Sequence, residues 1–259
     1  MLRVYRFVLF FSLSLLFLPN YTIAKEENED IPEHVLPIER ENTYSNEPED
    51  DVTIEPSFQT KDLLDSIDDP IDNLELIKLL NETSIRPTPF SFGYRGEVYL
   101  GRWPIHYESK ETKMNWEYQK VNETEISNFG TNATQSIVYE QQEEREVKGA
   151  LMSQIANPDS VKRMMVQKVQ KKTNLPLAFS TMIGKGTKTN HSYQVPPEKH
   201  GVLTVYVPAA YERGQITFGE VYVELKGTKK SLIIKNVTKQ NIGAWIPVQD
   251  YVSFSLSVK

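Results

Sequence analysis

The clearest pattern in this chain is the alternation of apolar and polar residues in its last forty positions. In residues 220–225, valine and leucine alternate with Glu and Tyr, and in residues 251–258 apolar residues alternate with Tyr251 and three serines. Such alternation is typical of strands with one face in a core and one in water. Val202–Val207 and Leu232–Ile234 are apolar runs of strand length. Strands at this spacing, joined by glycine and proline turns, predict an α+β fold that is mainly antiparallel β, of sandwich or barrel type.

Shorter runs of the same kind extend the predicted sheet toward the N-terminus. Residues 97–100, residues 115–121 and the apolar Ile137–Tyr139 read as further strands.

Two segments have helical rather than strand spacing. Val161, Met164, Met165 and Val169 form one apolar stripe, and Asn157-Pro158-Asp159 is a favourable helix start. This spacing predicts a helix at about 158–172. A second, short helix is predicted at about 72–81, with Asp72 as its N-cap and Glu75 three residues later.

The N-terminal part has neither pattern. Residues 1–24 combine Arg3 and Arg6 with an apolar run and small residues before position 25, which is typical of a cleavable signal peptide. Residues 25–57 are mostly Glu, Asp, Asn, Pro and Ser, which predicts a disordered acidic arm. Residues 58–259 are then expected to form a single mainly-β globular domain. The expected destination is therefore the exterior of the cell or its envelope.

Charge divides the chain in the same place. Residues 25–75 contain 18 acidic and 3 basic residues, whereas residues 76–259 contain 17 acidic and 24 basic residues, within an overall net charge of −6. The acidic arm is either a solvated tail or a segment that covers a basic face. Because the body is only mildly basic and the chain is expected to be exported, nucleic acid is not an expected partner.

Several kinds of chemistry are excluded or disfavoured. The 259 residues include no cysteine, which removes thiol catalysis, thiolate metal sites and disulfides. His191, Glu198 and His200 lie close in the sequence, but in a predicted surface loop, so no metal site is expected. Serine-hydrolase and zinc-protease motifs are absent and no cofactor is expected, so an enzyme is less favoured than a binding protein and catalytic residues are unknown.

Candidate ligand contacts come from two segments. The stretch from position 86 to position 118 contains arginines among many aromatic residues, and the predicted helix at 158–172 carries a basic face. Aromatic rings stack on sugars, while Lys and Arg bind phosphate or carboxylate groups. The candidate contacts are Arg86, Arg95, Arg102, Trp103, Lys162, Arg163 and Lys168.

Two segments resemble a known family. Gly93–Tyr107 reads GYRGEVYLGRWPIHY and Asn241–Tyr251 reads NIGAWIPVQDY, and both are similar to the YfkD-like family of Gram-positive bacteria. The resemblance implies an exported bacterial protein whose function is not characterised. It supplies no catalytic residues.

The expected function is that of an exported, non-catalytic cell-envelope protein that binds an anionic wall polymer or another envelope protein. Peripheral membrane contact is compatible with the basic residues. One alternative is a wall or matrix glycan hydrolase without a recognisable motif, for which Glu97, Glu108 and Glu117 are candidates because they lie near tryptophans. The other is a structural component of an envelope assembly.

Overall fold

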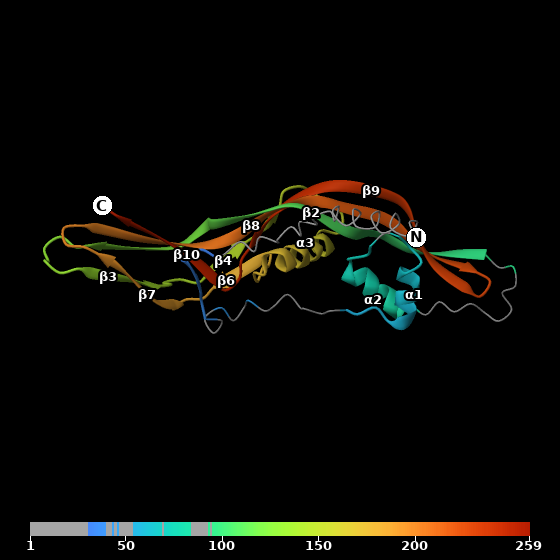
Figure 1. Cartoon of the computed structure of the whole chain (residues 1–259), viewed down its shortest axis with the longest axis horizontal. Coiled ribbons are helices and arrows are strands. Elements are labelled where there is room, and N and C mark those ends of the chain that lie inside the picture. Colours follow the sequence, from blue (N-terminus) through green and yellow to red (C-terminus); the bar gives the residue numbers. More distant parts are fainter. Residues whose placement is uncertain are drawn as a thin grey trace, which may run out of the picture.

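The computed structural model of the chain is long and narrow (Figure 1). The structure describes residues 31–39, 43, 46, 54–68, 70–83, 93 and 95–259. The predicted signal peptide, residues 1–24, lies outside these residues, as does Arg86. None of the helices in the described part has the length and apolar character needed to cross a bilayer.

Two very long antiparallel strands run along the molecule. β2 pairs with β8 from one end to the other, and β8 pairs on its other edge first with β10 and then with β9. β1 extends the sheet beyond β10, and β5 extends it beyond β9. The bounds are β1 Val35–Pro37, β2 Arg95–Ser127, β5 Ala150–Leu151, β8 His200–Lys226, β9 Lys229–Pro247 and β10 Tyr251–Val258.

Smaller elements cover this sheet. β3 pairs with β7, β4 pairs with β6, and α3 lies along the middle of the sheet, while α1 and α2 pack near one end (Figure 1). Their bounds are β3 Gln135–Glu140, β4 Arg145–Lys148, β6 Ser180–Ile183, β7 Lys188–Val195, α1 Phe58–Leu64, α2 Leu74–Glu82 and α3 Pro158–Thr173.

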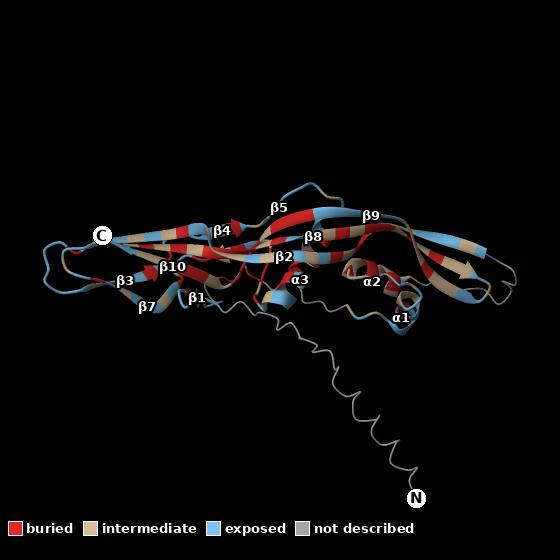
Figure 2. Ribbon diagram, turned by 45° about the horizontal axis from the view of Figure 1, so that its top comes forward, coloured by how far each residue is buried: buried red, intermediate tan, exposed pale blue. Residues whose placement is uncertain are grey.

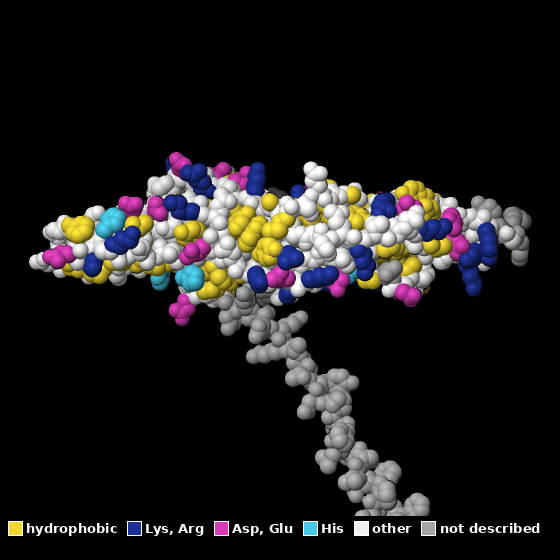
Figure 3. All heavy atoms as spheres, turned by 90° about the horizontal axis from the view of Figure 1, so that it is seen from above, with side chains coloured by type: hydrophobic (Ala, Val, Ile, Leu, Met, Phe, Trp, Pro, Cys, Tyr) yellow, Lys and Arg dark blue, Asp and Glu magenta, His cyan; other side chains and the backbone are white. Residues whose placement is uncertain are grey.

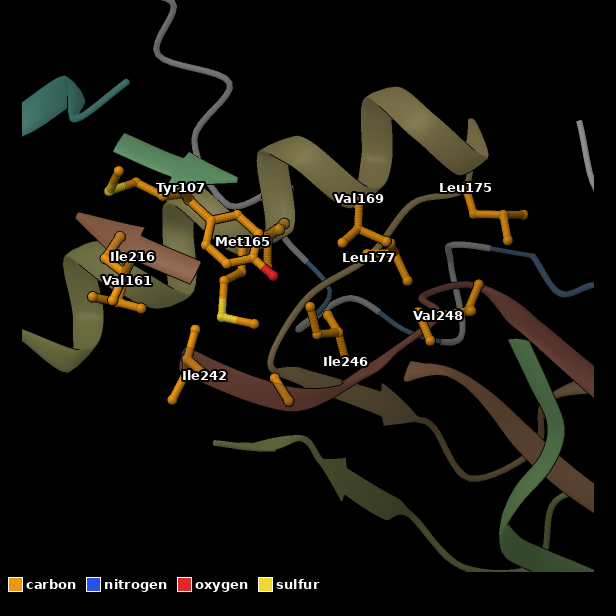
Figure 4. Close-up of a cluster of buried hydrophobic side chains, with 14 of the residues drawn as sticks. Tyr107, Val161, Met165, Val169, Leu175, Leu177, Ile216, Ile242, Ile246 and Val248 are labelled. Carbon is orange, nitrogen blue, oxygen red and sulfur yellow. The ribbon is translucent and has the colours of Figure 1, made fainter. Parts of the chain in front are cut away.

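The buried side chains form three clusters along the sheet (Figure 2). In the middle cluster, Met165 and Val169 of α3 share a core with Ile216 of β8 and Ile246 of β9 (Figure 4). A second cluster lies between the sheet and the small strands at one end, and a third lies beneath α2 at the other.

The alternation of buried positions along strand β8 changes phase twice. The core positions are odd-numbered in residues 203–207, even-numbered in residues 210–218, and odd-numbered again at 221 and 223. The second change coincides with a register shift between β8 and β9 at Phe218/Glu220, and α2 and α3 lie on the same side of the sheet, since Glu75 of α2 contacts Ser160 and Arg163 of α3. β2 adapts to this course through several register shifts against β8.

The predicted fold class is confirmed: the described chain is mostly antiparallel β with a helix at Pro158–Thr173. Of the two proposed architectures the barrel does not form, since the sheets stay open. The segments predicted as separate strands at 97–100 and 115–121 are parts of the single strand β2.

Two predictions near the N-terminus need correction. Val35–Pro37 lie inside the interval predicted to be a disordered arm, yet they form β1 and pair with β10, because β10 has a free edge there. The helix predicted at 72–81 is α2, but its N-cap is Asn73, whose side chain accepts hydrogen bonds from the amides of Glu75 and Leu76. Asp72 instead contacts His106 Nδ1 of β2 at 2.5 Å.

Candidate functional site

An open cleft of about 480 Å³ lies where the start of α3 meets β2. It is lined by Arg102 and Trp103 of β2, by Asn157–Ser160 and Arg163 at the start of α3, and by Glu75 of α2. Three of the seven ligand contacts expected from the sequence therefore meet in one place.

A register shift in β2 next to Gly101 shapes one wall of the cleft. Gly101 has a φ of 115°, a left-handed conformation that favours glycine. The Trp103 indole folds back over it and donates from Nε1 to the carbonyl oxygen of Leu100 at 2.9 Å. A Cβ at position 101 would lie only 3.0 Å from that nitrogen. The glycine thus allows the half-buried ring of Trp103 to lie at the cleft wall.

Arg102 is held by the neighbouring strand β9. Its guanidinium donates to the carbonyl oxygen of Asn236 at 3.2 Å and to Thr238 Oγ1 at 2.5 Å. The side chain is exposed, but these two contacts restrict its orientation. Arg102 is therefore a fixed cationic group at the cleft wall rather than a freely moving one.

The other wall is the first turn of α3. Asn157 has a φ of 51° and makes no side-chain capping bond; its Nδ2 instead donates to the carbonyl oxygen of Arg102 at 3.5 Å. The first amides of a helix have no intrahelical acceptor and favour negative charge nearby. The carboxylate of Glu75 lies here and accepts hydrogen bonds from Ser160 and Arg163. This wall therefore already holds a carboxylate group.

The charges in the cleft are balanced. Arg102 and Arg163 face Glu75 and Asp159, and Asp159 in turn pairs with Lys162 Nζ at 3.3 Å. Such a cleft offers fixed donors, acceptors and an aromatic edge, which suits a polar ligand with hydroxyl and acidic groups. Within the described part of the chain, His, Asp and Glu side chains do not form a group that could hold a metal ion.

The remaining predicted contacts lie elsewhere. Lys162 lies beside the cleft, 5.6 Å from the centre of the Phe179 ring, and Lys168 is exposed farther along α3. Arg95 lies at the far end of β2, opposite Lys226. The prediction missed Glu75 and Ser160, although Ser160 belongs to the helix start that the sequence did indicate.

The three carboxylates considered for glycan hydrolysis do not come together. Glu97, Glu108 and Glu117 all lie on β2, and Glu97 pairs with Lys235 Nζ at 2.6 Å. At about 3.3 Å per residue, neighbouring members of this set are roughly 30 Å apart. Paired catalytic carboxylates of glycosidases are about 5–9.5 Å apart. These three residues cannot form such a pair.

The histidines of the predicted loop are instead on strands. His191 lies in β7 with its ring 4.7 Å from that of Tyr193, and His200 begins β8 with its Nδ1 2.9 Å from Ser127 Oγ. The turn between them contains Glu198, whose φ is 60°. The prediction of a loop was wrong because β7 and β8 extend almost to each other.

The comparisons with known proteins agree with the resemblance seen in the sequence. The model of the family described as YfkD-like protein matches residues 32–259. The "Uncharacterized protein YfkD" of Bacillus subtilis (strain 168) is 49% identical over 228 residues, which cover 88% of this chain and 86% of that protein. Among solved structures, the crystal structure of Lamprey immune protein aligns with 63% of this chain and 53% of its own at 8% identity, with a TM-score of 0.28. The chain belongs to the YfkD-like family.

Proposed function

We propose that this protein is an exported, non-catalytic component of the cell envelope that binds an anionic wall polymer in the cleft between β2 and α3. The observation that carries the proposal is the meeting of Trp103, Arg102 and Arg163 at the start of one helix. An aromatic edge beside two cationic side chains suits a sugar that carries a phosphate or carboxylate group.

The internal contacts of the cleft support an acidic ligand group. Ser160 and Arg163 already bind the Glu75 carboxylate, so these donors can bind an acidic oxygen, and an acidic group of the polymer would compete with Glu75 for them. An acidic group of the polymer would bind between Arg102 and the start of α3, with its sugar ring against Trp103. Because Arg102 is already held by β9, little side-chain entropy is lost on binding.

Export and envelope localisation are part of the same proposal. They rest on the first 24 residues, where two arginines precede an apolar run and small residues. We do not propose glycan hydrolysis, because the candidate carboxylates on β2 are too far apart to act as a pair.

Co-sedimentation of residues 25–259 with isolated cell wall across a salt series tests the proposal. Arg163→Gln should weaken binding about tenfold or more, because a hydrogen bond to a charged group contributes about 1.5–3 kcal/mol. Trp103→Phe should weaken it less, since a ring remains. The matched control is Lys168→Gln, which removes one positive charge from the same helix outside the cleft and should leave binding nearly unchanged.

Circular dichroism and thermal unfolding of each variant should match those of the parent, so that lost binding is not lost folding. Equal binding by the parent protein and Arg163→Gln, or an equal loss for Lys168→Gln, would reject the cleft as the polymer site.

A further inference from the structure

The three-stranded end of the sheet beyond α1 and α2 has a surface unlike the rest of the molecule. We name it the hairpin tip and define it as residues 95–99 of β2, 222–226 of β8 and 229–233 of β9. β8 and β9 are joined here by a tight turn at Gly227, and the tip projects at one end of the long molecule (Figure 1). Basic side chains lie at that end in the view from above, with acidic ones beside them (Figure 3).

The last row of the tip consists of three cations. Arg95 is directly opposite Lys226, and Lys226 is directly opposite Lys229. Neighbouring strands lie about 4.7–4.9 Å apart, and like charges directly opposite one another are destabilising. Glu224 offsets part of this repulsion by pairing with Lys226, and an external anion would offset the rest.

The nearby carboxylates neutralise the tip only in part. Glu224 pairs with Lys226 at 2.7 Å and Glu97 pairs with Lys235 at 2.6 Å. Within the described chain, no carboxylate lies within ion-pair distance of Arg95, Lys229 or Lys230. These three residues are a local surplus of positive charge.

Apolar side chains are exposed beside these cations. Tyr99 is 55% exposed and Val98 is 38% exposed, and both lie on β2, which is an edge strand here. The Tyr99 ring lies 5.0 Å from that of Tyr222, and Lys235 Nζ is 4.8 Å from the centre of the Tyr222 ring. Tyrosine and aliphatic side chains next to Lys and Arg are typical of segments that lie in a membrane interface.

We propose that the hairpin tip docks on an anionic lipid surface. The cations bind lipid phosphates, while Tyr99 and Val98 enter the boundary between head groups and acyl chains. Val98 and Tyr99 point to opposite faces of β2, so only a surface that the tip enters end-on covers both; a hydrated wall polymer would bind the cations but would leave Val98 in water, which favours lipid.

The cations of the tip are distinct from those of the cleft, although the two sites are neighbours on β2. Arg102 lies seven residues from Arg95 along β2, which is roughly 20–25 Å at 3.3 Å per residue. Tyr99, the inserted residue of β2 nearest the cleft, is three residues from Arg102, or roughly 10 Å along the strand, so a protein docked by its tip would hold the cleft close to the membrane surface. The docking does not depend on the proposed polymer binding, and the two can be tested independently.

The test is sedimentation of the mature chain with vesicles of phosphatidylcholine, alone or mixed with phosphatidylglycerol. The parent protein should bind the anionic vesicles in a salt-sensitive manner and bind phosphatidylcholine alone much more weakly. The double variant Lys229→Glu/Lys230→Glu should bind the anionic vesicles at least 25-fold more weakly, because each cation near the surface contributes about fivefold to the affinity. Tyr99→Ser should lower the affinity for the anionic vesicles severalfold, at high and at low salt alike.

The matched control is Lys168→Glu/Lys171→Glu, which makes the same charge change at two exposed positions of α3. It should retain most of the vesicle binding, and so should Arg163→Gln. Equal binding to neutral and anionic vesicles, or equal losses in the two double variants, would overturn the proposal. So would a tip variant that loses binding to soluble polyphosphate while its vesicle binding is unchanged.

Discussion

The middle of the sheet and the hairpin tip place charged residues of the same strand in opposite environments. In the middle, Glu212 of β8 is 0% exposed, and its carboxylate accepts hydrogen bonds from Tyr107 Oη at 2.7 Å and Thr112 Oγ1 at 2.5 Å. At the tip, Lys226 of the same strand lies between two other cations. The buried charge has its partners inside the protein, whereas the cations beside Lys226 have them outside. Glu212 and Lys226 are fourteen residues apart on β8. The charge at Glu212 stabilises the fold, whereas we infer that the cations around Lys226 bind a partner.

The largest expected effect is in the middle of the sheet. Met165 is 0% exposed and belongs to the cluster between α3 and the sheet (Figure 4). Met165→Ala should lower the free energy of unfolding by about 2–5 kcal/mol, because it leaves a cavity in a packed core. Urea denaturation measures this as a lower midpoint with an unchanged slope.

The same substitution at an exposed methionine provides the control. Met152 is 49% exposed, and Met152→Ala should change the free energy of unfolding by no more than about 0.5 kcal/mol. Similar effects at the two positions would mean that α3 does not pack as described.

The next effect concerns the buried carboxylate. Tyr107→Phe removes the hydroxyl that donates to Glu212 Oε1 and should lower the free energy of unfolding by about 1–3 kcal/mol at neutral pH. Thr112 would still donate to the other oxygen, so folding should persist. Phe at this position keeps the ring over Gly214, whose neighbours leave no space for a Cβ.

The pH dependence of stability identifies the same hydroxyl. Burial, and then the negative charge and hydrogen bond of Glu212, raise the pKa of Tyr107 well above its usual value of 10.0. The contribution of Tyr107 to the free energy of unfolding is fully present below pH 10. Above pH 10 this tyrosine loses its proton in the unfolded chain before it does so in the folded protein, so stability falls as pH rises. Tyr107→Phe should reduce this alkaline loss by the slope of one proton. Burial also raises the pKa of Tyr193 to about 12, so part of the loss should remain. An unchanged alkaline slope in Tyr107→Phe would contradict this account.

The sequence predicted local elements better than their extent. The helix start at Asn157-Pro158 and the apolar stripe of Val161 and Met165 predicted α3 within a residue, because both signals are local. Strand β8 was divided into pieces, because the alternation of buried and exposed positions breaks near residues 208 and 219. β1 was missed, since its three residues depend on the free edge of β10 rather than on a pattern of their own.

The candidate site was only partly visible in the sequence for a related reason. Arg102, Trp103 and Arg163 were identified by residue type, but their meeting depends on how α3 crosses β2. Glu75 was assigned to helix capping, and only the tertiary structure places its carboxylate against Ser160 and Arg163. Arg95 was grouped with the cleft residues by its position in the sequence, yet the length of β2 carries it to the other functional surface.

The smallest expected effect is a gain in stability at the hairpin tip. It tests directly whether the charges of the tip, unlike the buried Glu212, are unfavourable within the fold. Lys229 is opposite Lys226, so Lys229→Glu replaces a repulsive cross-strand pair with an attractive one. We expect the free energy of unfolding to rise by about 0.2–1 kcal/mol at low salt and the gain to fade as salt screens the pair. Lys229→Gln should give a smaller gain. The same substitution that stabilises the fold should weaken binding to phosphatidylglycerol vesicles, because a cation kept at a cost to stability is one that serves a partner. A less stable Lys229→Glu protein would mean that Lys229 has a favourable contact within the fold, and the contrast between the tip and the middle of the sheet would then be lost.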